Sequence, residues 1–232
     1  MGLTACALPF HLYASTNLDE QGVALECSAL PATPISHLGA LQADERLHEY
    51  DIYLRGPPLA SRVLPIRATR RVPLWLALDQ VVDPHNLGAI LRSAHYFGVD
   101  GVMLCERNSA PLSPAVSRAS AGALEFMEIF SSKVLMTTLE DSRASGWQTL
   151  GATLGASAKE LSATTASEIA TKPTILVLGS EGRGLRPAVR RLCDMQVKIS
   201  GAKVDGPEAV DSLNVSVAAG ILINALISAT AR

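Results

Sequence analysis

The stretch "LWLALDQVVDPHNLGAILRSAHYFGVDGVMLC" (74–105) decides the fold class, because it holds two strand-like segments separated by a helix-like one. Residues 74–79 form a short apolar run of strand length, and residues 100–105 form a second. The amphipathic pattern between them begins near Pro84, a residue favoured in the first helical turn, and stops at Gly98, a residue favoured just after a helix. A strand, a helix and a strand in this order predict a parallel α/β sheet.

The same alternation continues to the C-terminus. Further strands are predicted over 147–154, 174–179 and 195–200, and further helices over 113–127, 132–146 and 186–193. We therefore expect one α/β domain over residues 73–232. Residues 1–72 differ in character, with short apolar pieces broken by Pro- and Gly-containing stretches, and we expect them to be a separate N-terminal segment. Within that segment, the charged stretch 41–54 predicts a short helix.

Composition excludes several classes of protein. A chain of 232 residues with 48% hydrophobic content can bury a sizeable core, and its net charge of −2 argues against a globally basic nucleic-acid binder. Any RNA affinity must therefore come from local patches. The four cysteines and five histidines are dispersed, so we expect no metal site and no disulfide frame. No apolar run reaches the ~18 residues of a membrane span, so we expect no membrane partner. The first 15 residues hold no Lys or Arg, so no transit peptide is visible.

The final helix-like segment, "DSLNVSVAAGILINAL" (211–226), is apolar on almost every side. A helix of this kind is buried in a core or in an interface between chains, and the pattern leaves both readings open. Its first turn nevertheless carries Ser212 and Asn214, whose polar groups need partners if they are buried. Ser212 as the N-cap would explain one of them, but a single cap leaves Asn214 unexplained.

Three segments follow the ends of predicted strands, where α/β sheets bind their ligands. They are 80–92, which contains Asn86 and Arg92, then "SEGRG" (180–184), then 201–214. A G-x-G-x-x-G fingerprint, a Walker A motif and a G-x-S-x-G elbow are all missing from the chain. A nucleotide-dependent oxidoreductase of doubly wound type is therefore disfavoured.

These segments resemble the motifs of a known family. "DPHNLGAILRSAHYFGVDGVML" (83–104), "LVLGSEGRGL" (176–185) and "SLNVSVAAGILI" (212–223) are similar, in this order, to the three motifs of the SpoU (TrmH) family of S-adenosylmethionine-dependent RNA ribose 2′-O-methyltransferases, in the SPOUT superfamily. The resemblance covers about residues 73–232. It implies a parallel sheet with a deep C-terminal trefoil knot, and a homodimer with the final helix near the interface.

Within that family, the stretch 19–31 resembles the linker after an N-terminal RNA-binding domain, and the loop of the third motif is long. Both features are most like the mitochondrial large-subunit rRNA guanosine-2′-O-methyltransferases. The resemblance thus implies an rRNA substrate and a mitochondrial location, with a cytoplasmic location as the alternative. It also implies that residues 1–72 are a remnant or linker after an RNA-binding domain that is missing or truncated.

The resemblance assigns roles to individual residues. The catalytic set that it implies is Arg92, Asn86, Glu181, Ser212 and Asn214. The set that it implies for holding S-adenosylmethionine is Leu178, Gly179, Ser180, Gly182, Ile199 and Leu213. Where many members have an Ile-Pro-Met stretch and a short loop, this chain has Ile199-Ser200-Gly201 and a longer loop, so the cofactor contacts from 200 to 211 differ from the family pattern.

Arg92 is expected to bind the phosphate beside the target ribose and to stabilise the developing alkoxide, because a guanidinium resists deprotonation. Cations for further phosphate contacts gather in two clusters, Arg62, Arg67, Arg70 and Arg71, and Arg183, Arg186, Arg190 and Arg191. Two alternative functions remain open at this point: a non-catalytic rRNA-binding or ribosome-assembly factor that retains the fold, and a tRNA ribose methyltransferase.

Overall fold

The computed structural model describes residues 11–13, 24–26, 30–43, 48–57, 60–66, 72–201 and 212–230. The chain divides into two compact units, Met1–Pro31 and Ala32–Arg232. In the first unit, strands β1 (His11–Tyr13) and β2 (Ala24–Glu26) pair antiparallel. Strand β2 falls within the expected linker, and residues 19–23 and 27–29 of that linker lie outside the described residues.

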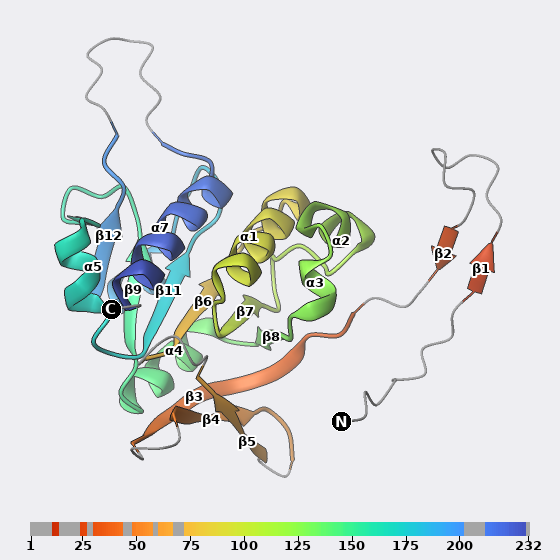
Figure 1. Ribbon diagram of the computed structural model, residues 1–232, viewed down its shortest axis with the longest axis horizontal. Coiled ribbons are helices and arrows are strands. Elements are labelled where there is room, and N and C mark those ends of the chain that lie inside the picture. The colour runs from red at the N-terminus through yellow and green to blue at the C-terminus, as the bar shows by residue number, and fades with distance from the viewer. Residues whose placement is uncertain are drawn as a thin grey trace. The chain divides into compact units, whose positions relative to one another are not determined.

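The second unit is built on one sheet, with ten strands among its described residues (Figure 1). Their order across the sheet is β10-β12-β9-β11-β6-β7-β8-β3-β4-β5, parallel from β10 to β3 and antiparallel from β3 to β5. The strands are β3 (Thr33–Ala43), β4 (His48–Leu54), β5 (Ala60–Pro65), β6 (Leu74–Leu78), β7 (Gly101–Cys105), β8 (Ile129–Ser132), β9 (Gln148–Ala152), β10 (Lys159–Glu160), β11 (Thr174–Leu178) and β12 (Met195–Lys198).

Helices cover both faces of this sheet. They are α1 (Pro84–Phe97), α2 (Pro114–Ser120), α3 (Ala123–Phe126), α4 (Leu135–Ala144), α5 (Ala163–Ile169), α6 (Pro187–Leu192) and α7 (Val215–Thr230). Figure 1 shows α1 and α7 side by side across one face of the central strands, and the two helices are in contact. The α/β fold class with a mostly parallel sheet is therefore confirmed.

The strand–helix–strand unit of 74–105 forms as its sequence predicts. Helix α1 begins at Pro84 after the N-cap Asp83, whose side chain accepts a hydrogen bond from the His85 amide at 2.9 Å. It ends at Gly98, which has the left-handed backbone (φ 75°) typical of a helix C-cap. The helix predicted over 113–127 is instead two helices, α2 and α3, because the backbone takes positive φ at Ala121 and Gly122 between them.

The prediction of a helix over 41–54 is wrong, because β3 ends and β4 runs through this stretch. The side chains of Tyr50 and Ile52 are buried while their neighbours Asp51 and Tyr53 are only partly buried. This period of two is that of a strand with one face on the core. Residues 33–65 thus form an antiparallel extension within the same compact unit as the parallel sheet.

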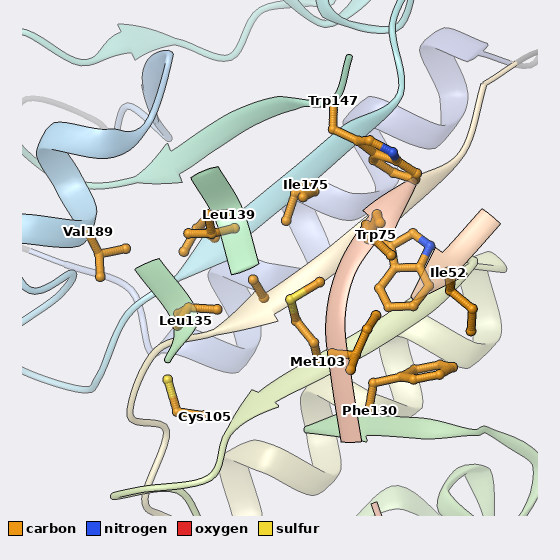
Figure 2. Close-up of a cluster of buried hydrophobic side chains, with 14 of the residues drawn as sticks. Ile52, Trp75, Met103, Cys105, Phe130, Leu135, Leu139, Trp147, Ile175 and Val189 are labelled. Atoms are coloured by element: carbon orange, nitrogen blue, oxygen red, sulfur yellow. The ribbon is translucent and has the colours of Figure 1, made fainter. Parts of the chain in front are cut away.

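One face of the sheet carries an aromatic core (Figure 2). The Trp75 indole lies flat over Gly101, where an added Cβ would come within 2.4 Å of the ring, so only glycine fits there. Trp75 donates from Nε1 to Tyr50 Oη at 2.8 Å, and Trp147 donates from Nε1 to the carbonyl oxygen of Gly39 at 2.7 Å. These two bonds attach β3 and β4 to the parallel strands. Leucines of α4, and Val189 of α6, pack on the same cluster.

The opposite face is covered by α1 and α7. Leu87, Ile90 and Leu91 of α1 are buried, and Ala219, Leu222, Ile223 and Leu226 of α7 are buried as well. The far side of α7 leaves Val217 49% and Ile221 44% exposed. The final helix is therefore apolar on two faces. One face is buried within the chain, and the other is exposed.

None of the helices in the described residues is long and apolar enough to cross a bilayer.

The hydrogen bond between Trp75 and Tyr50 generates a stability prediction. Replacing Tyr50 by Phe should lower the free energy of unfolding by about 1–3 kcal/mol, because the buried indole N–H loses its acceptor. Tyr53→Phe is the matched control, since Tyr53 lies on the other face of the same strand, partly exposed and stacked on His37. Its effect should stay within about 0.5 kcal/mol. Urea titration measures both, and equal effects would contradict the prediction.

Candidate functional site

The three segments that follow strand ends converge at one edge of the sheet. Strands β6, β11 and β12 run parallel, so their carboxyl ends face the same edge (Figure 1). Leu78 pairs with Leu178, and the Asp79 amide donates to the Leu178 carbonyl oxygen at 2.8 Å, which keeps the chains together just past the strand ends. The beginnings of α1 and of the 179–184 loop are therefore neighbours.

The structure brings Asn86 and Asn214 into direct contact. Asn214 Nδ2 donates to Asn86 Oδ1 at 2.9 Å, and Asn86 Nδ2 donates to Asp83 Oδ2 at 3.2 Å. Asn214 Oδ1 accepts from the backbone amide of Ser216 at 2.8 Å and from its hydroxyl at 2.6 Å. Asn214 therefore serves two purposes at once: it caps α7 and it links the first turn of α7 to the first turn of α1.

Ser212, which the sequence left open as the N-cap of the final helix, does not occupy the cap position. Helix α7 begins at Val215, so Asn214 occupies the cap position and its side chain accepts from Ser216 two residues on. Ser212 lies two residues earlier and is exposed. The capping side chain is thus the amide, whose second polar atom remains free to donate to Asn86.

The glycine loop 179–184 folds tightly on itself. The amide of Ser180 donates to the Gly184 carbonyl oxygen at 3.1 Å, and the Gly184 amide donates back to Ser180 at 2.9 Å. A Cβ on Gly179 would lie 2.2 Å from the Gly184 carbonyl carbon, so this close approach requires glycine. Gly182 and Gly184 take positive φ of 72° and 64°, and open space surrounds the position of a Cβ on either. The outer backbone of the loop is therefore accessible to a ligand.

Within the described part of the chain, the other predicted site residues make no side-chain hydrogen bond to the asparagine pair. Among the described residues, the side chains of Arg92, Glu181 and Ser212 make no hydrogen bond or ion pair, and all three are exposed. Leu213 is 48% exposed and Ile199 is half-buried. Leu178 is buried in its strand. The expected contacts of 202–211, and Arg67, Arg70 and Arg71 of the first arginine cluster, lie outside the described residues.

Sequence reasoning missed a buried ionic group beside the loop. The Asp79 carboxylate is fully buried and forms an ion pair with Arg186, whose Nε donates at 2.8 Å and whose Nη2 lies 2.7 Å from Oδ1. Cys105 Sγ contacts the same oxygen at 3.7 Å. Burial, reinforced by the negative charge of Asp79, raises the pKa of the Cys105 thiol to about 11, so the thiol stays protonated and donates. An acidic residue ending the apolar run 74–79 was the available signal, because buried carboxylates need partners.

The chemistry open to this site is limited by its residues. Within the described ranges, no group of three His, Cys, Asp or Glu side chains is placed to hold a metal ion. The amides at its centre, buried Asn86 and exposed Asn214, are uncharged, and the cations are exposed or already paired. Such an arrangement suits orientation of a substrate and electrostatic stabilisation rather than nucleophilic attack by a side chain.

Comparisons with known proteins match the part of the chain predicted to form the α/β domain. The family model described as SpoU rRNA Methylase matches residues 73–224. The chain is 41% identical over 211 residues to "rRNA methyltransferase 1, mitochondrial" of Dictyostelium discoideum, covering 90% of this chain and 38% of that protein. It is 40% identical over 151 residues to "23S rRNA (guanosine-2'-O-)-methyltransferase RlmB" of Pseudomonas syringae pv. tomato, covering 65% of this chain and 56% of that protein.

A solved structure shares the fold. The SpoU methyltransferase AviRb from Streptomyces viridochromogenes, crystallised with the cofactor AdoMet, superposes with a TM-score of 0.57 at 26% identity. The match covers 74% of this chain and 69% of that one. The chain thus spans roughly half or less of the length of the two curated relatives above, and most of the length of this solved structure.

The asparagine contact generates the next prediction. Asn214→Ala should lower the free energy of unfolding by about 1–2 kcal/mol, because α7 loses its N-cap. Asn214→Asp should stay within about 1 kcal/mol of wild type, because a carboxylate still accepts from Ser216 and is favoured at a helix N-terminus. Ser212→Ala is the control and should be neutral within about 0.5 kcal/mol. Thermal melting compares the three, and a Ser212→Ala loss as large as that of Asn214→Ala would reject Asn214 as the cap.

Proposed function

Because this chain belongs to the SpoU rRNA Methylase family, we propose that it transfers a methyl group from S-adenosylmethionine to a ribose 2′-hydroxyl of RNA. The observation that carries the proposal is the contact between Asn86 and Asn214. It joins the starts of α1 and α7 at the edge of the sheet where the 179–184 loop lies, so the three motifs form one site. The relatives' names support a guanosine of large-subunit rRNA as the target and mitochondria as the location.

The residues at this edge fit S-adenosylmethionine. Open space beside Gly182 and Gly184 lets the loop backbone approach a ligand closely. Leu213 exposes apolar surface that an adenine ring would cover, and half-buried Ile199 follows the end of β12. S-adenosylmethionine, when bound, supplies a methyl group on a positively charged sulfur. The residues proposed to hold it are Leu178, Gly179, Ser180, Gly182, Ile199 and Leu213.

The remaining residues of the site act on the RNA in this proposal. Arg92, exposed on α1, binds the phosphate beside the target ribose and stabilises negative charge on the 2′-oxygen as its proton leaves. A guanidinium keeps its proton in proteins, so Arg92 acts as a fixed cation. Asn86 and Asn214 orient the ribose, and Glu181 and Ser212 lie exposed at the same edge to contact the nucleotide. Alignment of this kind can lower a barrier by about 7–11 kcal/mol.

The protein is proposed to work as a homodimer through the exposed side of α7. Val217 and Ile221, both about half exposed, line a groove between α1 and α7 with Ala89, Ser93 and Phe97. Ser216, Gly220 and Asn224 complete the lining, and exposed apolar side chains bordered by polar ones are typical of an interface. We propose a second copy of this chain as the occupant of the groove. The groove lies along the contact between α1 and α7, the two helices that carry Asn86 and Asn214. The deep trefoil knot that the family resemblance implies stays a prediction.

Arg92 and the glycine loop should affect different steps. Arg92→Ala should lower methyl transfer to large-subunit rRNA by at least about 100-fold and leave the affinity for S-adenosylmethionine unchanged. Arg92→Lys should lose methyl transfer as well, because an ammonium group cannot reproduce the planar, bidentate contact of a guanidinium with phosphate oxygens. Gly179→Ala should lose cofactor binding first, since its Cβ would lie 2.2 Å from the Gly184 carbonyl carbon.

The test combines calorimetric titration of S-adenosylmethionine with labelled methyl transfer to rRNA and tRNA, and mapping of the modified riboses. Near-normal turnover by folded Arg92→Ala would reject its role. Methylation of tRNA alone would reject the rRNA substrate, and binding of rRNA without methyl transfer would favour the non-catalytic assembly factor.

The dimer has a separate test. Light scattering should give the mass of two chains for the wild type and of one chain for Ile221→Asp, because a carboxylate in an apolar interface loses its hydration. Leu154→Asp is the matched control, since Leu154 is also exposed and apolar but does not line this groove. A wild-type mass of one chain would reject the homodimer.

A further inference from the structure

The buried carboxylate of Asp79 is the meeting point of three segments that are distant in sequence. It directly follows strand β6, and it accepts from the backbone amide of Arg186 at 3.3 Å as well as from the guanidinium. Cys105, at the end of β7, adds a third donor. Asp79 has no exposed side-chain surface, whereas 41% of the Arg186 side chain is exposed. Burying a carboxylate this deeply costs free energy unless partners such as these compensate for its lost hydration.

Arg186 is the second residue after the glycine loop and its C-terminal anchor. The preceding Leu185 is buried against Gly151, where a Cβ would lie 2.9 Å from Leu185 Cδ1. At the other end of the loop, Leu178 accepts from the Asp79 amide. The backbone amide of Asp79 thus holds the start of the loop, while its side chain holds the residue that follows the loop.

We propose that Asp79 is a positioning residue that, through Arg186, fixes the 179–184 loop in the conformation that binds S-adenosylmethionine. The inference rests on the proposed function for the identity of the ligand. Its physical basis is preorganisation, because a loop already held in its bound conformation loses less conformational entropy when the ligand binds. Asp79 lies behind the loop and contacts it through backbone and Arg186, so it acts on affinity without touching the reacting atoms.

A second arginine–aspartate pair separates this role from general stability. Arg143 donates from Nε to Asp194 at 2.9 Å, and its side chain is 37% exposed, close to the value for Arg186. Asp194 also accepts from the amide and hydroxyl of Thr149. This pair ties α4 to β9 and the turn before β12, and makes no contact with the loop. Removing it should affect stability alone.

The experiment uses Asp79→Asn, Arg186→Gln, the double variant, and Arg143→Gln as the matched control. Hydrogen exchange without ligand should show the amides of Ser180 and Gly184 exchanging about tenfold faster in Asp79→Asn and Arg186→Gln than in wild type.

S-adenosylmethionine affinity should fall about tenfold in each, and by no more than that in the double variant, because the two residues act through one contact. The KM for the cofactor should rise to match, with kcat at saturation within about threefold of wild type. Arg143→Gln should change neither exchange nor affinity.

Several outcomes would overturn the proposal. Unchanged exchange at Ser180 and Gly184 would show that the pair does not hold the loop. Faster exchange with unaltered affinity would show that the Asp79–Arg186 pair fixes the loop but does not affect cofactor binding. Multiplied losses in the double variant would show that the two residues act separately. If Asp79→Asn fails to fold, Arg186→Lys gives the same test, since it keeps the charge but not the two-pronged contact. Failure of the wild type to bind S-adenosylmethionine would instead contradict the proposed function, and the exchange comparison would still report on the anchor.

Discussion

The register between β6 and β11 positions everything else at the site. Leu78 pairs with Leu178, and the ladder extends one bond further, to the Asp79 amide. A slip of one residue would turn Trp75 and Ala77 away from the aromatic core and toward the face that α1 and α7 cover. The packing of Trp75 on Gly101 specifies the register between β6 and β7, and the pairing of Leu78 with Leu178 places the start of α1 beside the glycine loop.

Helix α7 has to satisfy three different surroundings with one sequence. Its inner face is buried against α1 and the sheet, its outer face exposes Val217 and Ile221, and its first turn faces the site through Asn214. An amide suits the last position because it can accept from the helix backbone with one atom and donate to Asn86 with the other. A serine at the cap would carry donor and acceptor on a single oxygen, so that one atom would have to reach both Ser216 and Asn86.

The sequence was informative where a local pattern determines the structure. The apolar runs and the Pro84 and Gly98 signals predicted the strand–helix–strand unit, because these residues act on their own backbone. Residues 41–54 were misread because the partners that make β4 a strand, β3 and β5, are not visible in its own composition. The contact between Asn86 and Asn214 joins residues 128 positions apart, and the ion pair of Asp79 and Arg186 joins residues 107 apart. Such pairings depend on strand order, which periodicity does not contain.

The charged side chains described around the site are either paired within the protein or exposed to water. The carboxylate at the edge of the sheet, Asp79, is neutralised by Arg186 within the protein, and the centre of the site carries uncharged amides. Arg92 and Glu181 keep their hydration because they are exposed. An RNA strand would bring its own negative charge to such a surface, and the cost of desolvating Arg92 would then be offset by a phosphate. The one buried charge described at the site, Asp79, is paired, so the site can stay folded and preorganised when no ligand is bound.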